Sequence, residues 1–382
     1  MANDKTFKIK NGLSATRYLQ SSTAVAASDV DMSSGSYFTK TLSADITFTF
    51  SNPPASGSAG SFALEVTGAD VTVGYDLANA AYDSVTFSFS AQDNGGRGLF
   101  FKPDGTKFYI AGDGGNDINE YSMSTAWDLS TASYTTVFSV SSQDTSPYEV
   151  FFKPDGTKMY VMGDSNNSVF QYSLSTAWDI STASYDSVSF NVLSQEGSPY
   201  GLTFKPDGTK MYISGEQQDT VFQYGLSTAW DLSTASYDSV SFSASAQEAS
   251  VTAVEFSSDG TKMFVIGYSG DDVNEYALSP AWDLSSASYV QNFSVAAQAT
   301  FPASIRFKPD GTKMYILKDP SNFYQYSTAS STPATITYPA SVKWSGATTP
   351  DAPAGGEKDV YTFVTTDGGT TYYGKQAGDA VA

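Results

Sequence analysis

Residues 204–212 read FKPDGTKMY, and this stretch decides the fold because close variants of it occur five times along the chain. The copies are separated by 51, 52, 52 and 51 residues, as counted between their aspartates, Asp104, Asp155, Asp207, Asp259 and Asp310. A second motif, STAWDLSTASYDSV, keeps the same period and contributes Trp127, Trp178, Trp230 and Trp282. Tyr75 stands in the tryptophan position 52 residues before Trp127. Repetition at this period indicates an array of identical structural units.

Each unit is predicted to contain four short strands. In the third copy these are GLTFKP, KMYIS, TVFQYGL and YDSVSFSAS. The Pro-Asp-Gly-Thr between the first two favours a tight turn, and the last strand alternates apolar and polar residues. About 50 residues with four strands are typical of a blade of a β-propeller. A linear β-solenoid is the alternative, but its rungs are usually shorter.

The phase of the repeat predicts how the ring closes. The first copy begins with a fourth strand, residues 82–90, and the last copy stops after its third strand, near Tyr326. The strand at the front can therefore complete the blade at the back, which removes an exposed sheet edge. We expect an all-β protein with a five-bladed propeller of four-stranded blades, closed by its N-terminal strand.

The flanking segments are predicted to form one small base domain. Both contain short strands separated by Pro, Gly, Ser and Ala turns, and neither is long enough to bury a core alone. The expected division is 1–74 for the N-terminal part of the base, 75–329 for the propeller and 330–382 for the C-terminal part. The propeller would thus be an insertion into a β-sandwich-like base.

Composition excludes several classes of function. The 382 residues include no cysteine and no histidine, so disulfides, thiolate chemistry, imidazole bases and ordinary zinc sites are excluded. A formal net charge of −20 argues against a nucleic-acid partner; it favours solubility, with calcium binding as the sharper alternative. The N-terminus lacks the apolar region of a signal peptide, and no apolar run has membrane-spanning length. We expect synthesis in a cytoplasm without ordinary export and without membrane insertion.

The flanks resemble virion proteins of tailed bacteriophages, particularly fibre, appendage or decoration proteins of marine phages. The resemblance is carried by KTFKIKNGLSATRYL (5–19), by GSYFTKTLSADITFTFSNPPASGSAGSFALEVTG (35–68), and by the segment that begins YPASVKWSGATTPDAPAGGEKDVYTF (338–363). The repeats resemble propellers of the YVTN type with PDG turns, which bind or catalyse in many unrelated ways.

The resemblance implies a structural protein of the virion, not an enzyme. Its base would dock on other virion proteins through the N-terminal segment, as a homo-oligomer with a trimer favoured. Its propeller would present one face to a host-surface glycan or protein, as in a tail fibre. A capsid decoration or head fibre protein without a receptor role is the alternative, and a carbohydrate-active enzyme ranks below both.

Repeat phase also predicts which face is tethered. The chain enters and leaves in the connection between strands three and four, so the base attaches on the side of the PDGT turns and the tryptophans. The opposite, distal face holds variable polar loops, where calcium is the one cofactor we consider. The candidate binding residues there are Asp113, Asn116, Asp117, Asp164, Asn166, Glu216, Asp219, Asp271, Asp272 and Asp319.

Repeated residues are interpreted as scaffold. The four tryptophans and the five PDGT aspartates recur with the fold, so packing and turn formation explain them. A glutamine that recurs on the distal side is expected to bond neighbouring backbone. Its copies are Gln92, Gln143, Gln195, Gln247 and Gln298.

Departures from the repeat are more informative. Before the phenylalanine of strand one, the copies read Phe100, Phe151, Thr203, Glu255 and Arg306. Glu255 and Arg306 are predicted to form an ion pair between adjacent blades. Glu149 also breaks the repeat, so Glu149 and Glu255 form the one acid pair that a glycosidase could use near the channel, although a structural ion pair is the preferred interpretation.

Overall fold

The computed structural model describes residues 21–381, and these divide into two units. One unit combines the segments up to Thr72 and from Ser331 onward, and the other comprises Val73–Ser330. The predicted boundaries lie at 74/75 and 329/330. The proposed attachment segment, residues 5–19, lies outside the described residues.

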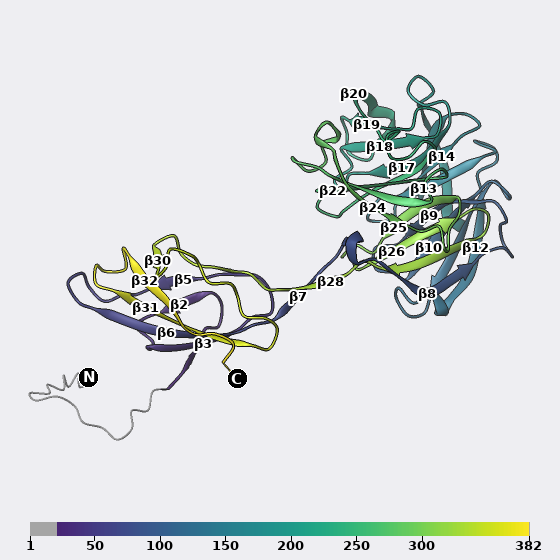
Figure 1. Ribbon diagram of the computed structural model, residues 1–382. Coiled ribbons are helices and arrows are strands. Elements are labelled where there is room, and N and C mark those ends of the chain that lie inside the picture. Colours follow the sequence, from purple (N-terminus) through teal and green to yellow (C-terminus); the bar gives the residue numbers. More distant parts are fainter. Residues whose placement is uncertain (1–20, 382) are drawn as a thin grey trace, which may run out of the picture. The chain divides into compact units, whose positions relative to one another are not determined.

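The larger unit is a five-bladed β-propeller, as predicted (Figure 1). Each blade is a sheet of four antiparallel strands, and the first strands of neighbouring blades contact one another around the ring. The first two blades are β9 (Gly96–Phe101), β10 (Lys107–Gly112), β11 (Asp117–Met123), β12 (Ala132–Ser139), and β13 (Pro147–Phe152), β14 (Lys158–Gly163), β15 (Ser168–Leu174), β16 (Ala183–Asn191). The third and fourth are β17 (Pro199–Phe204), β18 (Lys210–Gly215), β19 (Thr220–Leu226), β20 (Ala235–Ser243), and β21 (Val251–Phe256), β22 (Lys262–Gly267), β23 (Asp272–Ala277), β24 (Ser288–Ser294).

The fifth blade closes the ring with the first strand of the propeller segment. It consists of β25 (Pro302–Phe307), β26 (Lys313–Lys318), β27 (Asn322–Ser327) and β8 (Ala81–Ser88). β8 pairs antiparallel with β27, with Tyr82 opposite Tyr326. Lys313 adds an ion pair to Asp83 of β8 at 2.6 Å. Closure by the N-terminal strand is therefore confirmed.

Neighbouring blades share hydrophobic cores. The middle strands are buried on both faces, because each lies between two other blades, whereas outer strands such as β20 alternate exposed and half-buried residues. In the first three blades, the tyrosine of the KFY or KMY segment also reaches the next blade. Tyr109, Tyr160 and Tyr212 donate hydrogen bonds to the carbonyls of Trp178, Trp230 and Trp282 at 2.8, 2.6 and 3.0 Å.

The smaller unit is built on one six-stranded mixed sheet in the order β1-β3-β6-β31-β32-β30. Its strands are Thr23–Ala24, Tyr37–Thr41, Gly60–Thr67, Lys358–Thr365, Tyr372–Gly378 and Val342–Trp344. Two short parallel ladders, β2 (Asp29–Asp31) with β5 (Thr49–Ser51) and β4 (Ile46–Thr47) with β29 (Ile336–Thr337), accompany the sheet. Phe38, Phe62, Leu64, Tyr361 and Phe363 lie in its core. Both halves of the flanking sequence therefore contribute to one core.

Two strands carry the chain between the units. β7 (Asp70–Val73) leads into the propeller and β28 (Ser330–Pro333) leads out, and the two pair with each other. Directly after β7, Tyr75 donates its backbone N–H to Gly311 of the fifth PDGT turn at 2.7 Å. The chain thus enters and leaves the propeller on the side of the PDGT turns.

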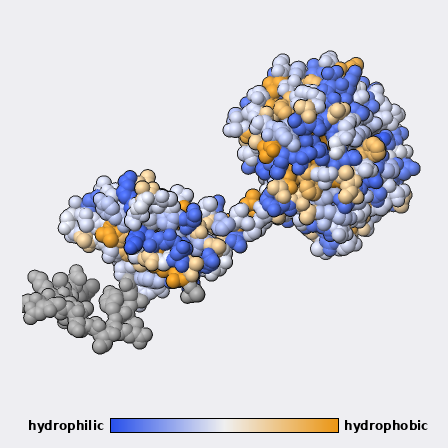
Figure 2. Space-filling model, viewed as in Figure 1, coloured by the Kyte–Doolittle hydropathy of each residue, from blue (hydrophilic) through white to orange (hydrophobic). Residues whose placement is uncertain are grey.

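The surface seen in Figure 2 is mainly hydrophilic, with apolar residues in small separate patches. This fits a chain with twice as many acidic as basic residues, 40 against 20. Among residues 21–381, no helix is long and apolar enough to span a membrane.

Candidate functional site

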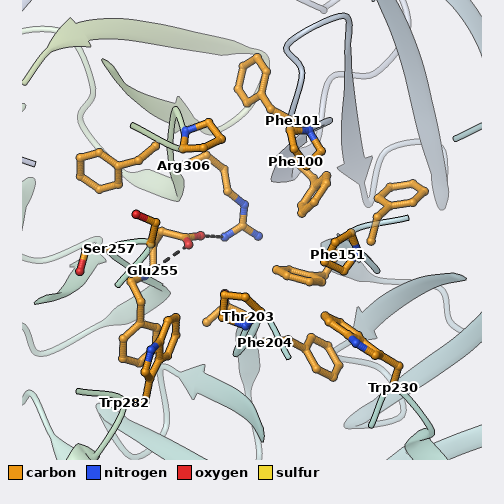
Figure 3. A pocket seen from close by; sticks show the side chains of 18 of the residues that line it. Phe100, Phe101, Phe151, Thr203, Phe204, Trp230, Glu255, Ser257, Trp282 and Arg306 are labelled. Atoms are coloured by element: carbon orange, nitrogen blue, oxygen red, sulfur yellow. Dashed lines mark hydrogen bonds and ion pairs between the residues drawn. The ribbon is translucent and has the colours of Figure 1, made fainter. Parts of the chain in front are cut away.

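A pocket of about 190 Å³ lies at the PDGT end of the central channel (Figure 3). Its wall repeats around the ring, because each blade contributes the phenylalanine that ends strand one, Phe101, Phe152, Phe204, Phe256 and Phe307. Three of the repeat tryptophans, Trp127, Trp230 and Trp282, also line it. Pockets for drug-sized ligands usually measure roughly 300–1,000 Å³, so this one suits a smaller molecule.

Turn geometry positions the tryptophans. Trp230 adopts a positive φ of 65° and donates its backbone N–H to Gly208 of the PDGT turn at 3.1 Å. Its indole covers that glycine so closely that a Cβ there would lie 2.3 Å from Nε1. The same ring stacks on Phe204, with centroids 5.4 Å apart. The tryptophans therefore serve the scaffold and form part of the pocket wall, a second role that the sequence did not predict.

The PDGT aspartates form the turns themselves. Oδ1 of Asp207 accepts hydrogen bonds from the backbone N–H and the hydroxyl of Thr209 at 3.0 and 2.6 Å. The same pattern recurs at the aspartates of the other four copies. These residues hold the hairpins that surround the pocket.

Arg306 crosses the channel at the floor of the pocket and bonds to the other four blades. Its Nε donates to the carbonyl of Leu99 at 2.6 Å, and Nη2 donates to that of Leu202 at 3.4 Å. Nη1 forms the predicted ion pair with Glu255, and Nη2 lies 3.3 Å from Oε2 of Glu149. One side chain of the fifth blade thus contacts strand one of every other blade.

The two glutamates differ in access. The Glu255 side chain is 18% exposed and lines the pocket, whereas that of Glu149 is 2% exposed and does not. Burial raises the pKa of Glu149 to about 7, against the opposing effect of Arg306. Burial likewise raises the pKa of Glu255 above its usual range. Since only one carboxylate lines the pocket, the geometry does not provide the two flanking carboxylates of a glycosidase.

The fourth blade changes the rim of the pocket. Four PDGT turns carry a lysine whose Nζ lies 2.7–2.8 Å from the turn aspartate. In the fourth blade the Lys-Pro of the repeat is replaced by Ser257 and Ser258, and both line the pocket. Asp259 therefore lacks the lysine partner of the repeat and accepts a hydrogen bond from Ser257 Oγ at 2.6 Å. With Glu255 and Arg306, the repeat-breaking residues gather on one side of the pocket (Figure 3).

The predicted distal residues lie in the loops at the other end of the channel, and two of them meet there. Asp113 and Asp319 both pair with Arg97, whose guanidinium lies over the ring of Tyr148. Glu216 accepts hydrogen bonds from Tyr200 at 2.8 Å and from Ser250 at 2.6 Å.

The other candidates make separate contacts with residues of nearby loops. Burial, with the nearby carboxylate of Asp93, raises the pKa of Asp117 to about 6. Asp272 accepts from two asparagine side chains, Asp271 accepts from the backbone of Phe301, and Asn166 donates to Asp144 and Gln143. Asn116 and Asp219 occupy turn positions of positive φ, and Asp164 accepts at its backbone carbonyl. Within residues 21–381, no three His, Cys, Asp or Glu side chains are arranged to hold a metal ion.

Four buried acidic residues that the sequence did not lead us to expect each secure one of the distal loops. Glu196, fully buried, accepts hydrogen bonds from the backbone of Ser198, Gln217 and Gln218 at 2.9–3.2 Å. Equivalent buried acids follow the repeat glutamine in three other blades, Asp93, Asp144 and Glu248. An acidic residue follows the repeat glutamine in four copies of the sequence, and this pattern could have predicted their shared role.

The glutamines have a different partner from the one expected. Four of them accept a hydrogen bond from a tyrosine hydroxyl of strand three at 3.2–3.3 Å, and these are Gln92, Gln143, Gln247 and Gln298. For these four side chains, the partner is a tyrosine of the buried third strand and not the expected neighbouring backbone.

No protein-family model matches the chain, and no curated protein matches it. Among solved structures, the periplasmic gluconolactonase of Pseudomonas aeruginosa is similar, with 20% identity and a TM-score of 0.39 over 57% of this chain and 62% of that one. A Bacteroides uniformis protein described as a candidate 6-phosphogluconolactonase has 13% identity and a TM-score of 0.40 over 70% and 80%. A Lactobacillus plantarum protein has 15% identity and a TM-score of 0.40 over 63% and 71%.

Two expectations are corrected by these similarities. Two of the three similar proteins are described as lactone-cleaving enzymes and none as a virion component. This contradicts the prediction of a bacteriophage structural protein with a host-binding face and the prediction that the chain is not an enzyme. At 13–20% identity the likeness carries the fold and no particular activity. The resemblance of the flanks, the trimer and the virion location are untouched by the comparisons and stay predictions.

Proposed function

We propose that the propeller is a carbohydrate-active domain whose site is the pocket at the PDGT end of the channel. The observation that carries the proposal is the convergence of repeat-breaking residues on that pocket. Glu255, Ser257, Ser258, Arg306 and Thr203 depart from the five-fold pattern, and all five line it. A scaffold alone would be served by the residues that the other blades share.

The lining suits a small sugar or a cyclic derivative of one. The aromatic wall gives an apolar surface against which the C–H groups of a sugar ring pack, and a few polar groups at one side fix its orientation. Glu255 Oε2 is bound to Arg306, while Oε1 has only a 3.3 Å contact with the N–H of Phe256. Oε1 is therefore the acceptor for a ligand hydroxyl.

Glu255 is also the group best placed to move a proton. Burial raises its pKa above the usual range of a glutamate, which is the direction that a general base requires. In ester or lactone hydrolysis, Glu255 would take a proton from water as the water oxygen bonds to the carbonyl carbon. The carbon–oxygen bond to the leaving alkoxide would then break, and the proton would pass to that alkoxide. The N–H donors of Arg306 are already engaged by protein acceptors, so Arg306 acts by positioning Glu255.

The test measures binding and turnover with the full chain. Calorimetry with monosaccharides should detect binding, and a pH-stat assay with sugar lactones, the substrates named for the similar proteins, should detect acid release. Glu255→Gln should lower turnover by about 10²-fold or more. Glu216→Gln, a hydrogen-bonded carboxylate at the distal end, is the matched control. Equal activity of the wild type and Glu255→Gln would rule out the assigned role, and absence of any sugar binding would refute the proposal.

A further inference from the structure

Charge around the pocket is unbalanced toward the acidic side. Arg306 is the one cation among the residues that line the pocket, and it faces two carboxylates, Glu149 and Glu255. At the rim, Asp259 adds a third carboxylate without the lysine that accompanies it in the other blades. Lys262, the nearest lysine of the fourth blade in sequence, is paired with Glu275 at 2.9 Å. Arg306 pairs with Glu149 and Glu255, so of the three carboxylates Asp259 is the one without a cationic partner among the described residues, on the side where the repeat is broken.

The remaining rim is electrically neutral. The lysines and aspartates of the other four PDGT turns pair with one another, Lys102 with Asp104, Lys153 with Asp155, Lys205 with Asp207 and Lys308 with Asp310. Arg306 has no free N–H for an anion, because its five N–H groups face the carbonyls of Leu99, Ile305 and Leu202 and the carboxylates of Glu255 and Glu149. An acidic ligand would therefore meet net negative charge and no available cation.

The aromatic wall also favours positive charge. The faces of Trp and Phe rings attract a cation that lies within about 6 Å of the ring centre. Trp230 and Trp282 line the pocket on either side of Thr203, and Glu255 lies above Trp282 in the view of Figure 3. An ammonium group in the pocket would thus lie near aromatic rings and a carboxylate, while the sugar ring fills the 190 Å³ space.

We infer that this pocket selects an amine-bearing sugar, in its protonated form, over neutral and acidic sugars of the same size. The inference rests on the proposed function and specifies its substrate class. The charge of the ammonium group compensates the excess carboxylate charge of the fourth blade at Asp259, beside Ser257, and Glu255 Oε1 stays available for the proton transfer of the proposed function. The replacement of the repeat lysine by Ser257 is what leaves that excess uncompensated.

The experiment compares matched sugars on the intact chain. Binding of D-glucosamine, N-acetyl-D-glucosamine, D-glucose and D-glucuronate is measured by calorimetry at about pH 6.5 and low ionic strength, where surface charge is least screened. We expect D-glucosamine to bind at least tenfold more tightly than D-glucose or the acetylated amine, with D-glucuronate the weakest. Ser257→Lys restores the residue of the repeat and should reduce D-glucosamine affinity about tenfold, and D-glucose affinity by less.

Two further variants keep the test decisive. Asp259→Asn removes the carboxylate that lacks a lysine, without adding bulk, and should weaken D-glucosamine binding in the same direction. Ser241→Lys adds the same charge on the exposed outer strand β20 and should leave binding unchanged. Equal binding of D-glucose and D-glucosamine would overturn the inference and leave the proposed function standing. Selectivity that survives both Ser257→Lys and Asp259→Asn would also overturn it, whereas failure of every sugar to bind would count against the proposed function itself.

Discussion

Arg306 shows how much a single residue can do in a closed ring. Its side chain is 6% exposed, and it reaches strand one of the other four blades through two backbone carbonyls and two carboxylates. Removing one partner of such a buried ion pair typically costs about 3–5 kcal/mol. The sequence predicted its pairing with Glu255, because the two stand at equivalent positions of adjacent blades. It could not predict the reach across the channel, which depends on how narrow the channel is.

Burial of Glu149 predicts that the stability of the fold depends on pH. The pKa of Glu149 rises from the usual 4.5 to about 7 in the folded protein because of burial. The folded state then binds the proton more tightly than the unfolded state does, so this group stabilises the fold below pH 4.5 and that stabilisation is lost as pH rises through 7. The free energy of unfolding of the wild type, compared with that of Glu149→Gln, should therefore fall between about pH 5 and pH 8. Urea titrations across this range measure it, and parallel curves for the two proteins would contradict the assignment.

At the scale of the element, the PDGT hairpin combines a turn with a packing surface. Gly208 adopts φ 73°, and Trp230 lies directly over its Cα. The sequence predicted the tight turn and the packing role of the tryptophan. It did not predict that the two come together around a pocket, because identical residues in every copy give no sign of which end of the channel stays open.

Gly208→Ala should destabilise the propeller for two reasons. An alanine at positive φ costs about 1 kcal/mol or more, and its methyl group would lie 2.3 Å from the indole of Trp230. We expect a total loss of roughly 2–4 kcal/mol, in the range of disruptive core changes. The control is Gly356→Ala, at φ 82°, where an added methyl group would have no atom within 4 Å, so it isolates the backbone cost. Both losses of stability are measured by thermal unfolding. Similar losses for the two variants would show that the Trp230 ring moves aside at little energetic cost.

For the whole molecule, closure of the ring by β8 was the most predictable feature. It follows from the phase of the repeat alone, and the register of Ala81–Ser88 against β27 agrees with it. The single base core formed by two distant segments followed from the same reasoning. The proposed site at the PDGT end of the channel was less predictable. Its residues were visible as departures from the repeat at Thr203, Glu255 and Arg306, but the loops of the opposite face looked more like a binding surface because they vary and carry more polar groups.

Closure predicts how fragments of the propeller behave. Residues 73–330 contain all the strands of the five blades, β8 included, and should give a monodisperse, cooperatively unfolding protein when expressed alone. Residues 90–330 lack β8, so the edge of β27 is unpaired and open to association with another chain. Size-exclusion chromatography should show aggregation of the shorter fragment. A monomeric and equally stable 90–330 fragment would mean that β8 contributes little to the ring.

The pairing of β7 with β28 has a consequence for the history of the gene. These two strands bring the ends of the propeller segment together, and the base takes its core from residues on both sides of that segment. A gene segment with such neighbouring ends can be acquired or lost in one recombination event without parting the strands of the base. We would therefore look among relatives for chains in which Ala69 and Ala334, already joined by a 2.8 Å backbone hydrogen bond, are linked by a short turn and the base stands alone.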